Sequence, residues 1–114
     1  MSIKIDRINS NLVKEISYVL MTEVKDPDVR FVTVTDVKTT SDLSYAKVYV
    51  TVLNKDKIKE TMKALKNASG FIRNVLKDRV EMRNIPELEF IYDESIEYGK
   101  KIEDIIEKIH EESE

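Results

Sequence analysis

The sequence predicts an α+β domain, because helical and strand-like patterns of apolar residues alternate along its 114 residues. Apolar residues recur at three- and four-residue steps over residues 5–24 and 58–80, as on amphipathic helices, and again at 102–109 within a segment of helical spacing from 95 to 110. Residues 30–37, 45–53 and 87–93 alternate in polarity, which is typical of strands. The predicted order is therefore helix, strand, strand, a helix in two parts, strand, helix, within a single domain spanning 1–114.

The first helix is expected to end at Lys25-Asp26-Pro27-Asp28, since proline disfavours helical geometry in the residue before it. We interpret Asp26-Pro27 as a helix stop and not as a functional motif. The short polar connection 38–44 favours an antiparallel hairpin between the first two strands. In the second strand we expect Ala46 and Val48 to face the core and Tyr45 and Tyr49 to face away. Stacking of Tyr49 on nucleic-acid bases is the less favoured alternative.

The segment from Lys55 to Val80 has a helical pattern that small residues interrupt at Asn67-Ala68-Ser69-Gly70. Gly70 is the only glycine among the first 98 residues, and glycine inside a helix costs about 1 kcal/mol relative to alanine. We therefore predict a kink, or a close approach by a partner's backbone, at Ala68-Ser69-Gly70. A new helix N-terminus near Ser69 would favour a bound anion.

Charge is unevenly distributed along the chain, although the net charge is only −3. Residues 93–114 carry −6, so the remainder carries +3, and the segment 55–83 alone carries +5. This separation predicts a basic working surface apart from an acidic C-terminal end. We expect the last residues, about 110–114, to be mobile.

The composition argues against several classes of function. The chain has no cysteine, which excludes disulfides, thiolate metal sites and a cysteine nucleophile and suits a reducing compartment. It contains no apolar run resembling a signal peptide or a membrane span of about 20 residues, so we expect a cytoplasmic protein without membrane association. The single histidine, His110, lies in the acidic end. No catalytic residues, cofactor, metal site or small-molecule substrate are expected. Four carboxylates at helical spacing are interpreted as a solvated helix face: Glu103, Asp104, Glu107 and Glu111.

Four sequence blocks, in order and with fitting spacing, resemble the ribosome-binding factor A family. They are Glu23 to Pro27 (EVKDP), Asp42 to Val50 (DLSYAKVYV), Ala68 to Arg73 (ASGFIR) and Arg83 to Asp93 (RNIPELEFIYD). The resemblance extends from about Arg7 to Ile109. It implies a bacterial-type (type II) KH-like sandwich, with a three-stranded sheet and helices on one face. A helix–kink–helix stands where ordinary KH domains carry a Gly-x-x-Gly loop.

The same resemblance implies a function. Members of the family bind the free or immature 30S ribosomal subunit, contact 16S rRNA and assist its late maturation, including processing of its 5′ end. The resemblance thus implies an RNA-binding assembly factor for ribosome biogenesis and not an enzyme.

The residues expected to contact RNA are cations that converge on the small-residue bend. Arg73 and Lys77 are four residues apart, so they share the helix face opposite Ile72. Cations beside a bend that permits close approach suit a phosphate backbone. The predicted RNA-binding residues are Lys63, Lys66, Ser69, Gly70, Arg73, Lys77, Arg79 and Arg83. The competing interpretation is that these are ordinary solvated side chains, with the stem of Arg79 lying on the core.

A second class of function remains open from the sequence. The chain could be a protein–protein interaction or dimerisation module without RNA binding, in which case the basic segment 55–83 would serve only solubility. We expect a monomer that binds RNA. A small metabolic enzyme would need a clustered acid–base constellation, which the sequence does not contain.

Overall fold

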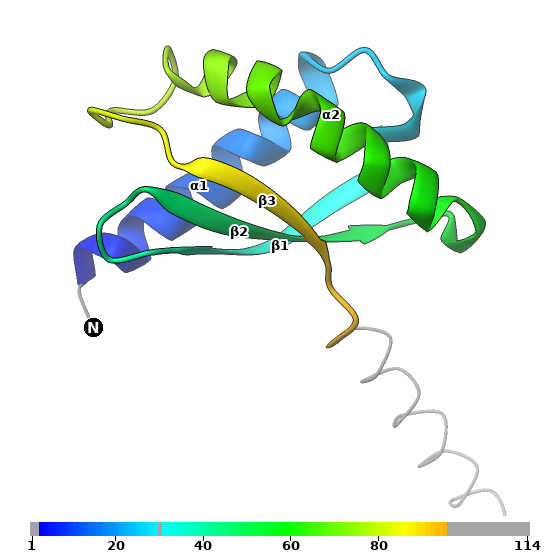
Figure 1. The fold of residues 1–114 in the computed structure, drawn as a ribbon, viewed down its shortest axis with the longest axis horizontal. Helices are drawn as coiled ribbons and strands as arrows, with labels where there is room; N and C mark the ends of the chain where they lie inside the picture. The colour runs from blue at the N-terminus through cyan, green and yellow to red at the C-terminus, as the bar shows by residue number, and fades with distance from the viewer. Residues whose placement is uncertain (1–2, 30, 96–114) are drawn as a thin grey trace, which may run out of the picture.

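The computed structural model describes residues 3–29 and 31–95, which form two α-helices and a three-stranded sheet (Figure 1). Helix α1 (Ile3–Thr22) leads through the 3₁₀ turn η1 (Pro27–Val29) to strands β1 (Val32–Thr39) and β2 (Tyr45–Val52). A second 3₁₀ turn, η2 (Lys55–Lys57), precedes helix α2 (Ile58–Leu76), and strand β3 (Glu87–Tyr92) follows. The fold class predicted from the sequence is therefore confirmed.

The sheet has the order β1-β2-β3, with β2 in the centre. Strands β1 and β2 form the predicted antiparallel hairpin, in which Val34 pairs with Val50. Strands β2 and β3 are parallel, and Tyr45 pairs with Glu87. A parallel pair cannot be joined by a tight turn, so the chain crosses over through α2. This topology lays α2 along β3.

The core lies between the two helices and one face of the sheet. Helix α1 packs on β1 while α2 packs on β3, and the helices also contact each other. On β2, Ala46, Val48 and Val50 are fully buried, whereas Tyr45 and Tyr49 are half-buried on the other face. The predicted orientation of β2 is thus confirmed. The helices contribute apolar side chains that are fully buried: Leu12, Ile16, Val19, Leu65, Ile72 and Leu76.

Strand β1 contains a bulge that its alternating pattern did not reveal. The pairing register shifts at Thr35, between Val34 and Asp36. The Thr35 hydroxyl donates a 2.6 Å hydrogen bond to Asp93, just past the end of β3. Asp93 also accepts bonds from the backbone N–H and hydroxyl of Ser95, and together these partners lower its pKa, with Ser95 the larger cause. The bulge therefore ties the two outer strands together across β2.

Helix α1 ends at Thr22, before the predicted stop at Lys25–Asp28. Its last turn closes on the Val19 carbonyl, which accepts from the N–H groups of Glu23 at 2.8 Å and Val24 at 3.2 Å. Asp26 then accepts the N–H of Asp28, and Pro27 begins the 3₁₀ turn. Asp26-Pro27 has a local structural role, as the sequence indicated, although it shapes the turn after the helix and not the helix end itself.

The predicted division of the second long helix into two parts is wrong, whereas a bend within one continuous helix stays a prediction. Helix α2 is one continuous element from Ile58 to Leu76, and Ala68, Ser69 and Gly70 lie within it (Figure 1). A single glycine raises the free energy of a helix by only about 1 kcal/mol, which the burial of the apolar stripe of α2 outweighs. The sequence also predicted that this stretch has no Gly-x-x-Gly loop, and residues 58–76 are helical throughout.

Several predictions fall on residues that the structure does not describe. The third helix, expected over 95–110, lies outside the described residues apart from Ser95. The carboxylates of residues 103–111 and the acidic end 110–114 also lie outside them. Within residues 3–29 and 31–95, no helix is long and apolar enough to span a membrane, and no cluster of three potential metal ligands occurs.

Candidate nucleic-acid interface

A groove of about 780 Å³ runs between α2 and the edge strand β3. One wall consists of residues from α2 that recur at three- and four-residue steps, and the other consists of residues from β3 together with Tyr45 of β2. Five of the eight predicted RNA-binding residues line it: Lys63, Lys66, Ser69, Gly70 and Arg73. The tertiary structure therefore brings most of the predicted site into one concave surface.

The α2 wall exists because α2 is amphipathic. Its buried stripe, which includes Leu65 and Ile72, packs on the core. Lys63 and Lys66 lie on a neighbouring face of the helix and are exposed. Residues three and four apart share a helix face, so both ammonium groups reach the same side of the groove. Paired exposed cations along a groove are suited to a phosphate backbone.

The small residues of α2 leave space in the groove and do not form an anion-binding helix end. The Ser69 hydroxyl donates a 2.8 Å hydrogen bond to the Lys66 carbonyl. A methyl group placed at Gly70 would meet no atom within 4 Å. Because α2 continues through both residues, their backbone N–H groups lie inside the helix and its hydrogen-bond ladder. The predicted helix N-terminus near Ser69 is therefore wrong.

Arg73 lines the groove but is already engaged by the chain itself. Its Nε donates to the Pro86 carbonyl at 3.1 Å and its Nη2 to the Ile85 carbonyl at 2.9 Å. Both acceptor residues are buried immediately before β3. The guanidinium thus fixes the start of β3 against α2. Lys77, expected on the same surface, is an exposed residue at the end of α2 and does not line the groove.

The β3 wall contains residues that the sequence analysis did not select. Glu87 and Glu89 are exposed on it, and Leu88 and Phe90 are half-buried between helix and sheet. The Tyr45 hydroxyl donates a hydrogen bond to the Glu89 carboxylate, which raises the pKa of that tyrosine. The alternation of residues 87–90 signalled a strand, but the sequence held no sign that this strand lies beside α2.

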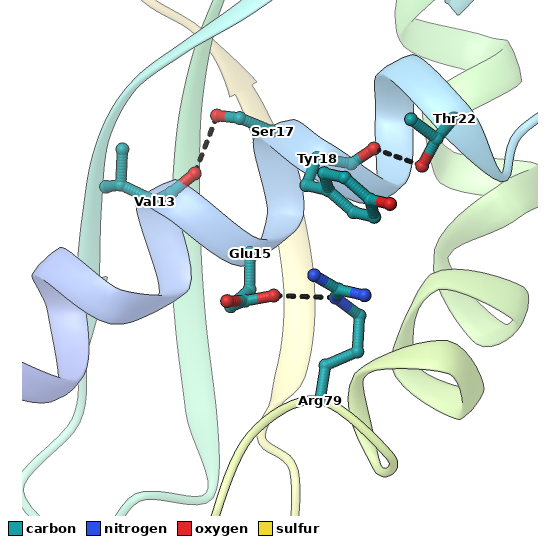
Figure 2. A network of polar contacts seen from close by, with 6 residues as sticks. All are labelled: Val13, Glu15, Ser17, Tyr18, Thr22 and Arg79. Carbon is teal, nitrogen blue, oxygen red and sulfur yellow. Dashed lines mark hydrogen bonds and ion pairs between the residues drawn. The ribbon is translucent and has the colours of Figure 1, made fainter.

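Arg79 and Arg83 lie away from the groove. The Arg79 Nε donates to Glu15 Oε2 at 2.6 Å, and its guanidinium stands 4.0 Å from the centre of the Tyr18 ring (Figure 2). Arg79 borders a separate hollow of about 590 Å³ beside α1, together with Arg7. Arg83 is exposed and lines a smaller hollow of about 330 Å³. These two arginines therefore do not converge with the α2 cations.

The outer face of the sheet carries the aromatic residues that offered an alternative binding mode. The Lys38 ammonium lies 5.5 Å from the centre of the Tyr49 ring. Tyr49 pairs with Asp36 in the register of the hairpin. This half-buried tyrosine is thus flanked by charged neighbours, whereas Tyr45 contributes to the rim of the α2–β3 groove.

Two helices on one face of an antiparallel–parallel sheet, with a cationic groove beside the edge strand, define a KH-like α+β domain. The family model described as ribosome-binding factor A matches residues 4–106. The chain belongs to the ribosome-binding factor A family.

Individual relatives agree with this assignment. The chain is 51% identical over 110 residues to ribosome-binding factor A of Staphylococcus epidermidis, covering 96% of this chain and 95% of that protein. The crystal structure of ribosome-binding factor A from Thermus thermophilus superposes with a TM-score of 0.71 at 26% identity, over 77% of this chain and 94% of that one. A homology model of the Thermus thermophilus factor, fitted into a cryo-EM map of a complex with the 30S subunit, gives a TM-score of 0.65 at 27% identity. That match covers 75% of this chain and 91% of the other.

Proposed function

We propose that this protein binds the free or immature 30S ribosomal subunit in the cytoplasm and contacts 16S rRNA through the α2–β3 groove. Binding there assists late maturation of the subunit, including processing of the 5′ end of its rRNA. The observation that carries the proposal is that three cationic residues of α2, Lys63, Lys66 and Arg73, line one groove that also has half-buried apolar residues. The fitted 30S complex of the Thermus thermophilus factor supports the choice of partner.

The predicted residues take different roles in this proposal. Lys63 and Lys66 contact phosphates directly, because both are exposed on the groove wall. Arg73 presents its charge and its remaining N–H donors to the groove while it holds the start of β3. Lys77, at the end of α2, and Arg83, in a separate hollow, lie outside the groove and act as outer electrostatic contacts. Arg79 positions the turn after α2 through its bond to α1.

Cosedimentation with purified 30S subunits tests this assignment. The double variant Lys63→Glu/Lys66→Glu removes the cationic wall and is expected to lose subunit binding at moderate salt. Lys14→Glu serves as the control, because it makes the same Lys→Glu change at an exposed position on α1. This variant is expected to retain binding. For a single-stranded rRNA segment, each lost phosphate contact also lowers the slope of log affinity against log salt by about 0.7. If the double variant binds 30S subunits as tightly as the wild-type protein does, the groove is not part of the interface.

One observation favours the second candidate, a module that dimerises or docks on a protein. Phe31 and Leu53 are 63% and 75% exposed, and the Leu53 N–H donates to the Phe31 carbonyl at 3.1 Å, so these apolar residues lie side by side. Sedimentation equilibrium separates the two candidates. We expect a monomer, whereas a dimer that Phe31→Ser dissociates would favour the second.

A further inference from the structure

Three chemically distinct sets of side chains line the α2–β3 groove. The α2 wall carries the ammonium groups of Lys63 and Lys66. The β3 wall carries the carboxylates of Glu87 and Glu89. The rest of the lining is apolar and half-buried, and it consists of Met62, Leu88 and Phe90. A nucleotide carries groups that match these three kinds of lining: an anionic phosphate, a flat ring and a hydrogen-bonding base edge.

A carboxylate at the base edge selects among bases because it can only accept hydrogen bonds. Cytosine offers an N4 amino group, and adenine and guanine also carry amino donors, so each can donate to a carboxylate. At the exocyclic position uracil carries a carbonyl oxygen where cytosine carries its amino group, and two oxygen acceptors repel. The ring N3–H is then the only donor that uracil can offer to a carboxylate. Single-stranded RNA exposes these Watson–Crick edges, which are paired in a duplex.

Glu89 differs from Glu87 in how it is held. The Tyr45 hydroxyl, on the central strand, donates to one oxygen of the Glu89 carboxylate. Tyr45 lines the same groove, so the restrained carboxylate belongs to its rim. A hydrogen bond to one oxygen limits the rotation of the carboxylate and leaves acceptor positions for a base. Side chains fixed by a neighbouring hydrogen bond give directional recognition, whereas a loose charge gives mainly general repulsion.

We propose that Glu89, oriented by Tyr45, makes this groove select nucleotides whose bases carry an exocyclic amino group and disfavour uracil. The inference rests on the proposed function, because it assigns a base-reading role to the wall opposite the phosphate contacts. It names the ligand class as single-stranded RNA with an amino-bearing base at the position beside Glu89.

Fluorescence anisotropy with labelled hepta-cytidylate and hepta-uridylate tests the proposal, since the two oligonucleotides differ only in the base edge. Wild-type protein is expected to bind the cytidine oligonucleotide at least tenfold more tightly. In Glu89→Gln the amide both donates and accepts. The preference should then fall to within about twofold. Glu87→Gln makes the same change of charge on the same strand, so it strengthens binding of both oligonucleotides and retains the preference.

The outcomes separate this inference from the proposed function. Equal wild-type binding of both oligonucleotides overturns base selection and leaves RNA binding intact. Binding of neither oligonucleotide at low salt overturns base selection, and cosedimentation with 30S subunits then decides whether the proposed function stands. A tenfold preference that survives Glu89→Gln would mean that another group reads the base. Tyr45→Phe provides a second variant: it retains the carboxylate but removes its restraint, and it should reduce the preference without abolishing binding.

Discussion

The Arg79 Nε donates a 2.6 Å hydrogen bond to Glu15 Oε2, and this ion pair joins the turn after α2 to the middle of α1 (Figure 2). The centre of the Tyr18 ring lies 4.0 Å from the same guanidinium. Tyr18 lies almost one helical turn beyond Glu15 on α1. Both contacts hold the segment that leads from α2 towards β3. Arg79 therefore helps to place the groove without lining it.

Replacing Arg79 with alanine is expected to lower the free energy of unfolding by about 1–2 kcal/mol. A partly exposed ion pair contributes about 0.2–1 kcal/mol and a cation–π contact about 0.5–1 kcal/mol. Urea denaturation followed by circular dichroism measures the loss. Arg83→Ala removes the same side chain at an exposed position nearby and should change stability by less than about 0.5 kcal/mol. Equal effects of the two variants would contradict the structural role of Arg79.

Replacing Arg73 with methionine is expected to destabilise the fold by about 2–3 kcal/mol. The variant retains much of the side-chain volume but leaves the carbonyls of Ile85 and Pro86 without the guanidinium that they accept from. Thermal unfolding checks this, with Lys66→Met as the exposed control on the same helix. If Arg73→Met unfolds like wild type, its hydrogen bonds do not anchor β3. A loss of RNA binding in an Arg73 variant must therefore be compared with its stability.

Replacing Gly70 with alanine should raise the free energy of unfolding by about 0.4–1 kcal/mol. Gly70 has helical geometry inside α2, and an added methyl group meets nothing within 4 Å, so alanine gains helix propensity without strain. The same methyl group enters the groove and is expected to weaken RNA binding. Denaturation and anisotropy together check both effects. Unchanged RNA affinity in the stabilised variant would show that RNA does not approach the helix at Gly70.

Acid should weaken the contribution of the β1–β2 connection through Asp42. The Thr40 hydroxyl, followed by the hydroxyl and the backbone N–H of Ser44, lowers the pKa of Asp42 from 3.8 to about 2. A carboxylate whose pKa is lower in the folded state stabilises the fold above its unfolded pKa and loses this effect as pH falls. The stabilisation is therefore present above about pH 4 and disappears towards pH 2.

The variant Asp42→Asn isolates this effect. Its urea midpoint should lie below that of wild type at pH 5, and the two midpoints should converge between pH 4 and pH 2. Measurements across this pH range by circular dichroism provide the test. A difference that stays constant down to pH 2 would mean that the ionisation of Asp42 does not stabilise the turn.

Local pattern alone identified the helices and strands that the structure describes, although it missed the bulge in β1 and divided α2. The alternation in 45–53 identified both strand β2 and its buried face, because side chains of a strand point to opposite sides in turn. The apolar periodicity of 58–80 likewise identified the helix that bears Lys63 and Lys66, and the charge of 55–83 identified this part of the chain as basic. The same local reasoning overstated Gly70, since a helix that buries one whole stripe tolerates one poor residue.

The sequence by itself thus determined the α+β class, the amphipathic faces and the cationic helix, all of which depend on neighbours a few residues apart. Only the tertiary structure decided which groups meet across long separations. The parallel pairing of β2 with β3 places Glu89 beside Tyr45, and the packing of α1 on α2 turns Arg79 towards Glu15. Charge and periodicity reveal which face of a helix carries the cations. The chain crossover decides whether a given cation faces RNA or another part of the protein.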